Sequence, residues 1–203
     1  MTKVTCDISI SVDGYAAGLN QSEAEPFGPR VGTRLHRWMF DQPEANAEAI
    51  ERITAARAYV MGRNMFAPVR GDWVPDWKGW WGDDPPYHAP VFVLTHHPRE
   101  PPEMQGGTTF TFVTDGIESA LAQAHEAAGG GDVAVAGGAN TINQYLTAGA
   151  IDELRLHVVP LVLGEGERLF EGVGEVELEP LDVSGNELVT HLSYRVVGAR
   201  GRR

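Results

Sequence analysis

The chain has 203 residues, a formal net charge of −12 and 42% hydrophobic residues, a composition typical of a globular protein with a core of its own. A surface this acidic repels phosphate backbones, so we expect no nucleic-acid partner. No apolar run approaches the ~20 residues that span a bilayer, and no signal-like segment opens the sequence. We therefore expect a cytoplasmic protein without membrane contact, and the single cysteine, Cys6, predicts no internal disulfide.

The first half of the chain alternates short apolar strands with helical stretches. Residues 3–12 predict a strand whose apolar face carries Val4, Cys6, Ile8 and Ile10 and whose polar face carries Thr5, Asp7, Ser9 and Ser11. A helix is predicted over about 44–57 and a buried strand over 58–61. Residues 68–90 contain four of the five tryptophans and predict an ordered surface loop.

The second half continues this alternation and closes on a hairpin. Strands are predicted at 91–95, 109–113, 132–136 and 154–159, and helices at 116–128 and from the 137–141 turn to about 148. The terminal hairpin is predicted to pair 176–183 with 187–197. The pattern favours one α/β domain, 1–203, with a largely parallel sheet and helices on its faces.

Three turns follow predicted parallel strands, at 62–66, at 95–97 and at 137–141. Open α/β sheets bind ligands at the carboxyl ends of their strands, so the convergence of the three turns is a stronger signal than any one of them. At the third turn, two glycines allow close approach to a helix start whose amides suit a pyrophosphate, although a plain strand-to-helix turn fits the same residues.

The other two turns carry polar side chains with alternative interpretations. Arg63 suits a phosphate such as the 2′-phosphate of NADPH, whereas a lone arginine is more often simply solvated. Thr95 and His96 suit contacts to the adenosine phosphate. Although His96 and His97 are adjacent, neighbours on an extended chain point to opposite sides, so we predict no metal site.

Several segments together resemble the dihydrofolate reductase superfamily, and within it the branch similar to the reductase domain of riboflavin biosynthesis. They are Ser-Val-Asp-Gly-Tyr (11–15), Val-Met-Gly-Arg-Asn-Met-Phe (60–66), Phe-Val-Leu-Thr-His-His-Pro (92–98), Val-Ala-Gly-Gly-Ala-Asn-Thr (135–141), Asp-Glu-Leu (152–154) and Pro-Leu-Val-Leu-Gly-Glu-Gly (160–166). The resemblance covers essentially the whole chain.

The resemblance implies a three-layer α/β fold of the dihydrofolate reductase type. Its sheet is mixed and mostly parallel, with eight strands, helices on both faces, a C-terminal antiparallel hairpin and NADPH across the strand ends. By position, Ala16 and Ala17 match the loop over the nicotinamide. The adenosine side is matched by Gly62, Arg63, Asn64, Thr95 and His96, and the pyrophosphate loop by Gly137, Gly138, Ala139, Asn140 and Thr141. Many members of this branch are homodimers, which we expect here also.

Hydride transfer also needs a proton donor near the acceptor atom. Asp7, His157 and His36 are the candidates, each with an alternative structural role. On the same side, Ser9 and Trp38 are candidates for binding a small-molecule substrate, although the tryptophan could equally fill the core or line a dimer contact. True dihydrofolate reductases place a carboxylate on the first helix, whereas residues 34–40 contain no acid, so dihydrofolate is not the expected substrate.

The sequence thus predicts an NADPH-dependent oxidoreductase acting on a small heterocyclic or carbonyl compound, similar to 5-amino-6-(5-phosphoribosylamino)uracil reductase. The alternative is a non-catalytic nucleotide- or ligand-binding protein on the same fold. A metal-dependent hydrolase is disfavoured because the histidines lack ligand spacing and no Gly-x-Ser-x-Gly elbow is present.

Overall fold

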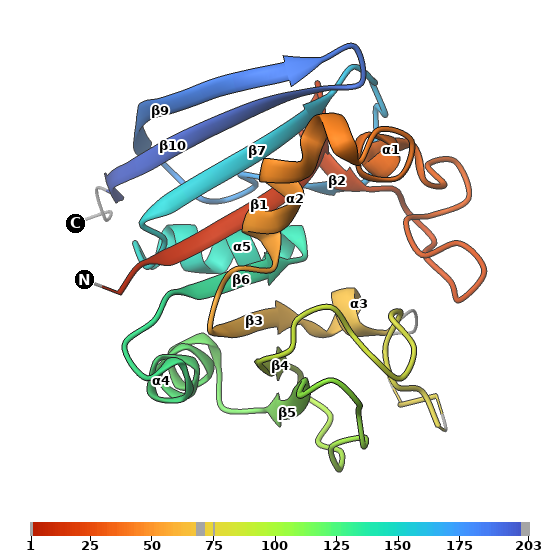
Figure 1. Ribbon diagram of the computed structural model, residues 1–203, viewed down its shortest axis with the longest axis vertical. Coiled ribbons are helices and arrows are strands. Elements are labelled where there is room, and N and C mark those ends of the chain that lie inside the picture. Colours follow the sequence, from red (N-terminus) through yellow and green to blue (C-terminus); the bar gives the residue numbers. More distant parts are fainter. Residues whose placement is uncertain (1, 68–71, 75, 200–203) are drawn as a thin grey trace.

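The computed structural model describes residues 2–67, 72–74 and 76–199, and its centre is a twisted sheet of eight strands (Figure 1). The strand order is β5-β4-β3-β6-β1-β7-β10-β9. These strands are β1 (Val4–Ser11), β3 (Ala58–Gly62), β4 (Pro90–Leu94), β5 (Thr109–Val113), β6 (Val133–Gly137), β7 (Glu153–Val159), β9 (Val176–Asn186) and β10 (Val189–Ala199). A small second sheet pairs β2 (Tyr15–Ala17) with β8 (Glu167–Arg168).

The strands from β5 to β7 are all parallel, and the C-terminal hairpin is antiparallel. β1 lies at the centre, with Cys6 opposite Val135 of β6 and Leu154 of β7. The predicted mixed, mostly parallel sheet with a terminal hairpin is confirmed.

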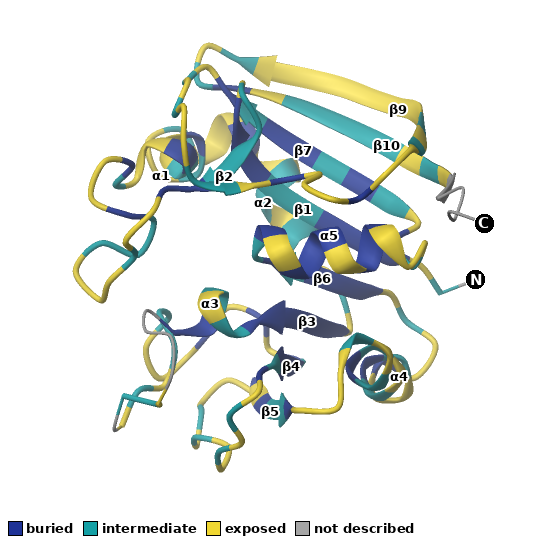
Figure 2. Cartoon of the chain, turned by 180° about the vertical axis from the view of Figure 1, so that it is seen from behind, coloured by how far each residue is buried: buried dark blue, intermediate teal, exposed yellow. Residues whose placement is uncertain are grey.

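The two faces of the sheet are covered by different parts of the chain (Figure 2). The helices α4 (Ile117–Ala128) and α5 (Ala139–Thr147) pack on one face, against the apolar side of β1. The opposite face is covered by residues 31–53 and by the tryptophan-rich loop. Residues 31–53 contain the short turns η1 (Arg34–His36) and η2 (Glu44–Asn46) and the helices α1 (Arg37–Phe40) and α2 (Ala47–Ile53). Because both faces are covered, even the polar residues Thr5, Ser9 and Ser11 of β1 are buried.

Several predicted boundaries differ from the structure. The helix predicted over 44–57 is divided into η2 and α2 and ends at Ile53, because the amide of Arg57 already donates to the carbonyl of Asp132 at the start of the sheet. The first hairpin strand, β9, extends three residues beyond its predicted end, whereas β10 has the predicted length and lies two residues later in the chain. β9 also has a register irregularity opposite Ser193 and Tyr194. A bulge of this kind leaves one residue unpaired, so simple alternation does not predict it.

The described parts of the tryptophan-rich loop, 72–74 and 76–89, form neither helix nor strand, although polar contacts of the indoles fix their position. The indole nitrogen of Trp77 donates to the carbonyl of Phe66 (2.7 Å), and that of Trp73 to the carbonyl of His97 (2.8 Å). The prediction for residues 68–71 and 75 lies outside the described residues. Among the residues that the structure describes, no helix is long and apolar enough to cross a membrane.

Candidate cofactor and active site

The turn after β3 lies directly against the turn after β6. The two strands are neighbours, with Met61 opposite Gly137, and the single-turn helix α3 (Arg63–Phe66) follows β3. A side chain on Gly62 would place its Cβ 2.3 Å from Oγ1 of Thr141, so only glycine allows this contact. The structure thereby brings together two of the turns that the sequence predicts as cofactor-binding.

The backbone between β6 and α5 is open on one side. Gly137 has a φ of +132°, and a Cβ there would lie 2.9 Å from the sulfur of Met65. The peptide bond from Gly137 to Gly138 is cis. A Cβ on Gly138 would meet no atom within 4 Å, so the space in front of this residue is free.

The start of α5 faces the same turn. Its first intrahelical bond joins the amide of Ile142 to the carbonyl of Gly138 (3.1 Å). The amides of the three preceding residues, Ala139 to Thr141, therefore have no acceptor within the helix. Three such amides at the positive end of a helix dipole suit an anionic group.

Two arginines flank one indole ring beside the turns after β3 and β4. The guanidinium carbon of Arg63 lies 4.1 Å from the centre of the Trp73 ring, and that of Arg99 lies 5.0 Å from the same ring. Burial, followed by the neighbouring Arg99, lowers the pKa of Arg63, although the nearby Asp72 opposes this shift. The arrangement creates local positive charge in a protein of net charge −12.

Of these three residues, only Arg63 was predicted from the sequence, whereas Arg99 and Trp73 were not. Arg99 follows His96-His97-Pro98, so its closeness to an already selected turn was the available signal. Thr95 is buried, and its hydroxyl accepts from the amide of His97 (3.0 Å), which shapes the turn after β4. His96 and Asn64 are exposed at the same edge.

The loop that carries Ala16 and Ala17 is held in place by Asp13. The carboxylate of Asp13 accepts from the hydroxyl of Ser11 (2.6 Å) and from the amides of Gly164 (2.7 Å) and Leu163 (3.1 Å). These hydrogen bonds, that of Ser11 first, lower the pKa of Asp13 to about 2, against the opposing effect of burial. The turn before Ala16 and Ala17 is therefore tied to residues 160–166, and both alanines lie in the short strand β2 that follows it.

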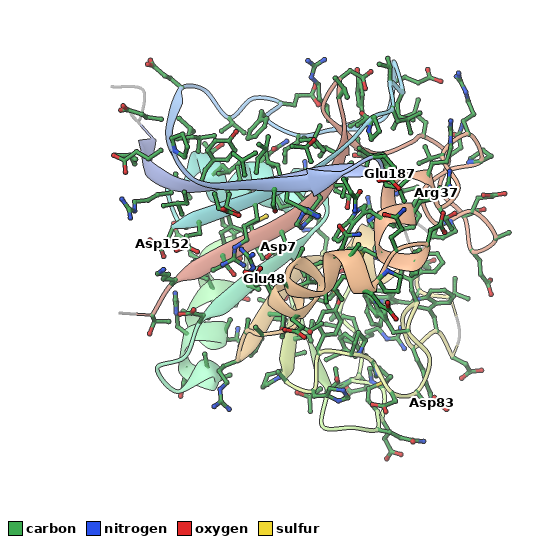
Figure 3. All side chains as sticks on the ribbon, turned by 45° about the horizontal axis from the view of Figure 1, so that its top comes forward. Asp7, Arg37, Glu48, Asp83, Asp152 and Glu187 are labelled. Carbon is green, nitrogen blue, oxygen red and sulfur yellow. The ribbon has the colours of Figure 1, made fainter. Side chains whose placement is uncertain are left out.

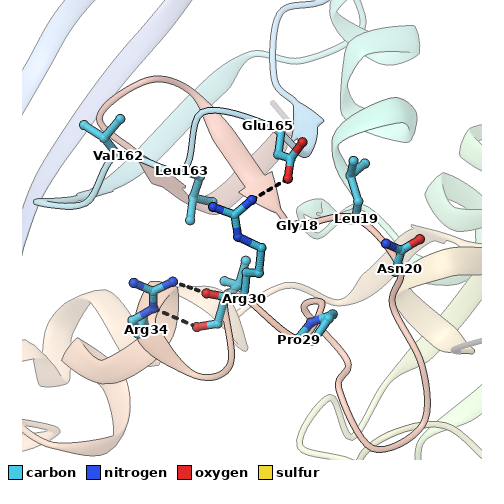
Figure 4. A pocket seen from close by; sticks show the side chains of 10 residues that line it. Gly18, Leu19, Asn20, Pro29, Arg30, Arg34, Val162, Leu163 and Glu165 are labelled. Carbon is cyan, nitrogen blue, oxygen red and sulfur yellow. Dashed lines mark hydrogen bonds and ion pairs between the residues drawn. The ribbon is translucent and has the colours of Figure 1, made fainter.

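Beside this loop is a cavity of about 170 Å³ (Figure 4). It is lined by Gly18, Leu19, Asn20, Pro29, Arg30, Val31, Arg34, Val162, Leu163 and Glu165. Arg30 spans it to reach Glu165 (2.6 Å), and Arg34 is bound to the carbonyls of Val31 and Arg30. The sequence analysis did not single out these arginines, which come from a segment without regular periodicity.

The candidate proton donors Asp7 and His157 meet on the face of the sheet opposite α5. Nε2 of His157 lies 3.5 Å from Oδ1 of Asp7, and Arg155 donates to the other carboxylate oxygen of Asp7 (3.1 Å). Figure 3 shows Asp7 within the sheet. Because Cys6 is level with Val135, the same register places Asp7 level with Ala136, one residue before Gly137. The pair thus lies close to the carboxyl end of β6.

Trp38 covers this pair. Its ring centre is 4.7 Å from that of His157, and its indole nitrogen donates to Oγ of Ser9 (3.1 Å). Only 1% of Trp38 and 5% of Ser9 are exposed to solvent. In this conformation both residues pack in the core and neither lines an open cavity, so a role in substrate binding stays a prediction that requires Trp38 to move.

His36 lies on the same covering segment. Its ring stacks on Phe27 with centres 4.4 Å apart, and burial, reinforced by His157, lowers the pKa of His36 to about 4. Three further polar residues of this face, Asn46, Arg155 and His191, were not predicted from the sequence. The period-two alternation of β7 and β10 places Arg155, His157 and His191 on one face, and this was the signal for two of them.

Comparisons with known proteins agree with one family. Residues 2–191 match the family model described as the RibD C-terminal domain. The uncharacterized protein YyaP of Bacillus subtilis is 23% identical over 172 residues, which cover 83% of this chain and 80% of YyaP.

Within the described part of the chain, no group of three or more histidine, cysteine, aspartate or glutamate residues is placed to hold a metal ion.

Solved structures show the same fold. A putative riboflavin biosynthesis protein from Shewanella sp. PV-4 has a TM-score of 0.66 at 21% identity and covers 96% of this chain and 99% of its own. A pyrimidine reductase-like protein from Corynebacterium diphtheriae has a TM-score of 0.60 at 14% identity, and the match covers 98% of this chain and 93% of that chain. RibD of Acinetobacter baumannii has a TM-score of 0.59 at 16% identity. The match covers 97% of this chain and 58% of that longer chain.

Proposed function

Because the chain belongs to the RibD C-terminal domain family, we propose that it is an NADPH-dependent oxidoreductase that reduces a small heterocyclic or carbonyl compound. The observation that carries the proposal is the turn from β6 into α5. There the free space in front of Gly138 adjoins three helix amides without intrahelical acceptors. These residues fit a dinucleotide diphosphate.

Each end of the cofactor has a matching part of the chain. Arg63 and Arg99 would hold the adenosine-side phosphate, and both guanidinium groups lie within cation–π distance of the Trp73 ring. Ala16 and Ala17, in the strand β2 that follows the turn fixed by Asp13, would limit movement at the nicotinamide end. When bound, NADPH supplies the hydride, so the protein's tasks are to orient the substrate and to provide a proton.

The proton would come from the buried polar face. Asp7 and His157 together form the proposed donor pair, and His36 is a further titratable group on the segment that covers them. Access to the pair needs a displacement of Trp38, because its ring covers His157. A substrate ring that takes the place of the indole would reach the polar face that carries Ser9.

We expect Gly138→Ala to weaken NADPH binding at least tenfold while the fold is retained. The φ of Gly138 is −78°, which alanine adopts without strain, and the added methyl group would meet no protein atom. It would instead occupy the space needed by the diphosphate. Titration with NADPH, followed by quenching of tryptophan fluorescence, measures the change in Kd.

The matched control is Glu126→Ala, an exposed change on α4, the other helix on the same face of the sheet, that should leave Kd unchanged. Equal affinities of Gly138→Ala and wild type would place the cofactor elsewhere. If the wild-type protein shows no saturable NADPH binding at high micromolar cofactor, the proposed function is rejected.

We further expect Arg99→Ala to lower the preference for NADPH over NADH by about tenfold, on the order of one charge-assisted hydrogen bond. The loss should fall on NADPH alone, because NADH has no 2′-phosphate. Arg57→Ala, an arginine at the opposite end of β3, is the control. Parallel titrations with both cofactors measure the ratio, and an equal loss for both would assign Arg99 a merely structural role.

One observation favours the second candidate, a non-catalytic nucleotide-binding protein. Trp38 fills the position above Asp7 and His157, as a plug would do in a fold that has lost turnover. This alternative predicts that the protein binds NADPH but does not oxidise it when pterins, pyrimidines, quinones or aldehydes are offered as substrates. Oxidation with any of them favours the reductase.

A homodimer is also proposed. The supporting feature is the outer strand β9, whose backbone edge is unpaired within the described chain. Its side chains Leu181 and Val183 are exposed. An open edge with apolar residues is a common site of pairing with a second copy.

A further inference from the structure

The orientation of the Asn46 amide fixes a chain of hydrogen bonds that ends at Asp7. Nδ2 of Asn46 donates to the carbonyls of Gln42 (2.8 Å) and Trp38 (2.9 Å). The reverse orientation would place an amide oxygen against two carbonyl oxygens, so Oδ1 must be the atom that faces the sheet. Asn46 is buried, with 4% of its surface exposed.

Oδ1 of Asn46 accepts from Nε2 of His191 (3.0 Å), and this determines the tautomer of that ring. Nε2 must carry a hydrogen because a carbonyl oxygen can only accept. Burial, with further contributions from His157 and Arg52 and against the effect of Asp7, lowers the pKa of His191 to about 4. The ring is therefore neutral near pH 7, and its Nδ1 has a lone pair and no hydrogen.

The next link is the 2.8 Å contact between Nδ1 of His191 and Nδ1 of His157. Since the first nitrogen can only accept, Nδ1 of His157 must donate. A neutral His157 would then present a lone pair at Nε2, facing Oδ1 of Asp7 at 3.5 Å. Both of these atoms are buried and have no other hydrogen-bond partner in the described structure. One more proton is required between them.

Arg155 decides where that proton resides. It donates to Oδ2 of Asp7 (3.1 Å) and to Glu153 (2.9 Å), and a cation on the carboxylate favours the ionised over the protonated acid. The additional proton therefore belongs to Nε2 of His157. The groups that surround this imidazole from each packed element are Asp7 on β1, Arg155 on β7, His191 on β10, His36 on η1, Trp38 on α1 and, behind His191, Arg52 on α2.

We propose that His157 is held as an imidazolium that donates to Asp7 and to His191, and that Asn46 and His191 are positioning residues that enforce this state. The role of the stored proton rests on the proposed reductase function. His157 is paired with Ser9 across the β1–β7 ladder, on the side of the sheet where the substrate is expected. The imidazolium is the proton reserve that a reduction at this site would draw on, and solvent would restore it after each turnover.

Nitrogen-15 NMR of the imidazole groups tests the proton placement in the full-length wild-type chain without cofactor. At pH 7 we expect protonated-type shifts for both ring nitrogens of His157. We expect one protonated and one unprotonated nitrogen for His191, with the proton on Nε2. The exposed His96 provides the internal reference. A neutral His157, with one unprotonated nitrogen, overturns the proposal.

Two variants test the His157–Asp7 contact and the His191–Asn46 hydrogen bond separately. In Asp7→Asn the side-chain amide can donate to Nε2, so His157 should lose one of its two protonated-type signals while His191 is unchanged. In Asn46→Ala the acceptor for His191 is gone, and its Nε2–H preference should be lost. A His191 pattern that is unaffected by Asn46→Ala contradicts the positioning role. Thermal unfolding identifies any variant that fails to fold, and the wild-type spectrum then decides.

The cofactor experiments distinguish the two proposals. If NADPH does not bind but His157 has both protons, the reductase function fails and the charge assignment stands. If NADPH binds and His157 is neutral at pH 7, the present inference alone is rejected.

Discussion

Trp38→Ala is expected to lower the free energy of unfolding by about 4 kcal/mol, within the range for large-to-small changes at buried aromatic residues. Trp38 is 1% exposed and packs with Val31, Leu35 and Val159 between the covering segment and the sheet. The change removes these contacts, leaves a cavity above His157 and deprives Ser9 of its indole donor. Chemical denaturation followed by far-UV circular dichroism measures the difference.

Phe40 offers a matched control in the same short helix. It is 66% exposed, so Phe40→Ala should change the unfolding free energy by no more than about 0.5 kcal/mol. Trp38→Phe keeps a ring but loses the donor to Ser9. Its loss of unfolding free energy should lie between those of Trp38→Ala and Phe40→Ala. A loss below about 1 kcal/mol for Trp38→Ala would show that the indole is not part of the core, and would favour a mobile wall of the substrate site.

The parts of the fold that the sequence predicted are those with local signals. The alternation in β1 and the continuous apolar run of β6 identify central strands without reference to other segments. The glycines at 62 and 137–138 mark turns. Gly62 has no room for a Cβ, and Gly137 has a positive φ. Since parallel strands end at one edge of a sheet, the convergence of these turns followed from the prediction that their strands are parallel.

The interior of the site was less predictable because it depends on contacts between distant segments. Asn46 and His191 are 145 positions apart, and nothing in the region around Asn46 distinguishes it from a solvated asparagine near a helix start. The proposed role of Arg99 depends on its contact with Trp73, whose indole nitrogen donates to the carbonyl of His97. Trp38 was predicted as a pocket wall, but the same large flat ring also serves as a core residue.

Stability should also fall on acidification, from pH 6.5 to about 4, because two histidines are neutral in the folded protein. Burial, reinforced by His157, lowers the pKa of His36 to about 4 from an unperturbed 6.5, and His191 is lowered to a similar value. In this interval the unfolded chain binds more protons than the folded one, so protonation favours unfolding. The contribution of the two neutral histidines to the unfolding free energy is fully present above pH 6.5. It declines as the pH falls and does not decline further below about pH 4. For His36 the loss is about 3 kcal/mol, and for the more exposed His191 it is smaller.

The variant His36→Gln isolates this contribution, since glutamine does not titrate. Its unfolding free energy should decline less steeply than that of the wild type between pH 6.5 and 4, whatever its stability at pH 7. Phe40→Ala, an exposed change that removes no titratable group, should reproduce the wild-type slope. The measurement is a series of urea denaturation curves across this pH range. Parallel declines for wild type and His36→Gln would mean that the His36 imidazole is solvated, and that the segment containing Trp38 does not close over the sheet in solution.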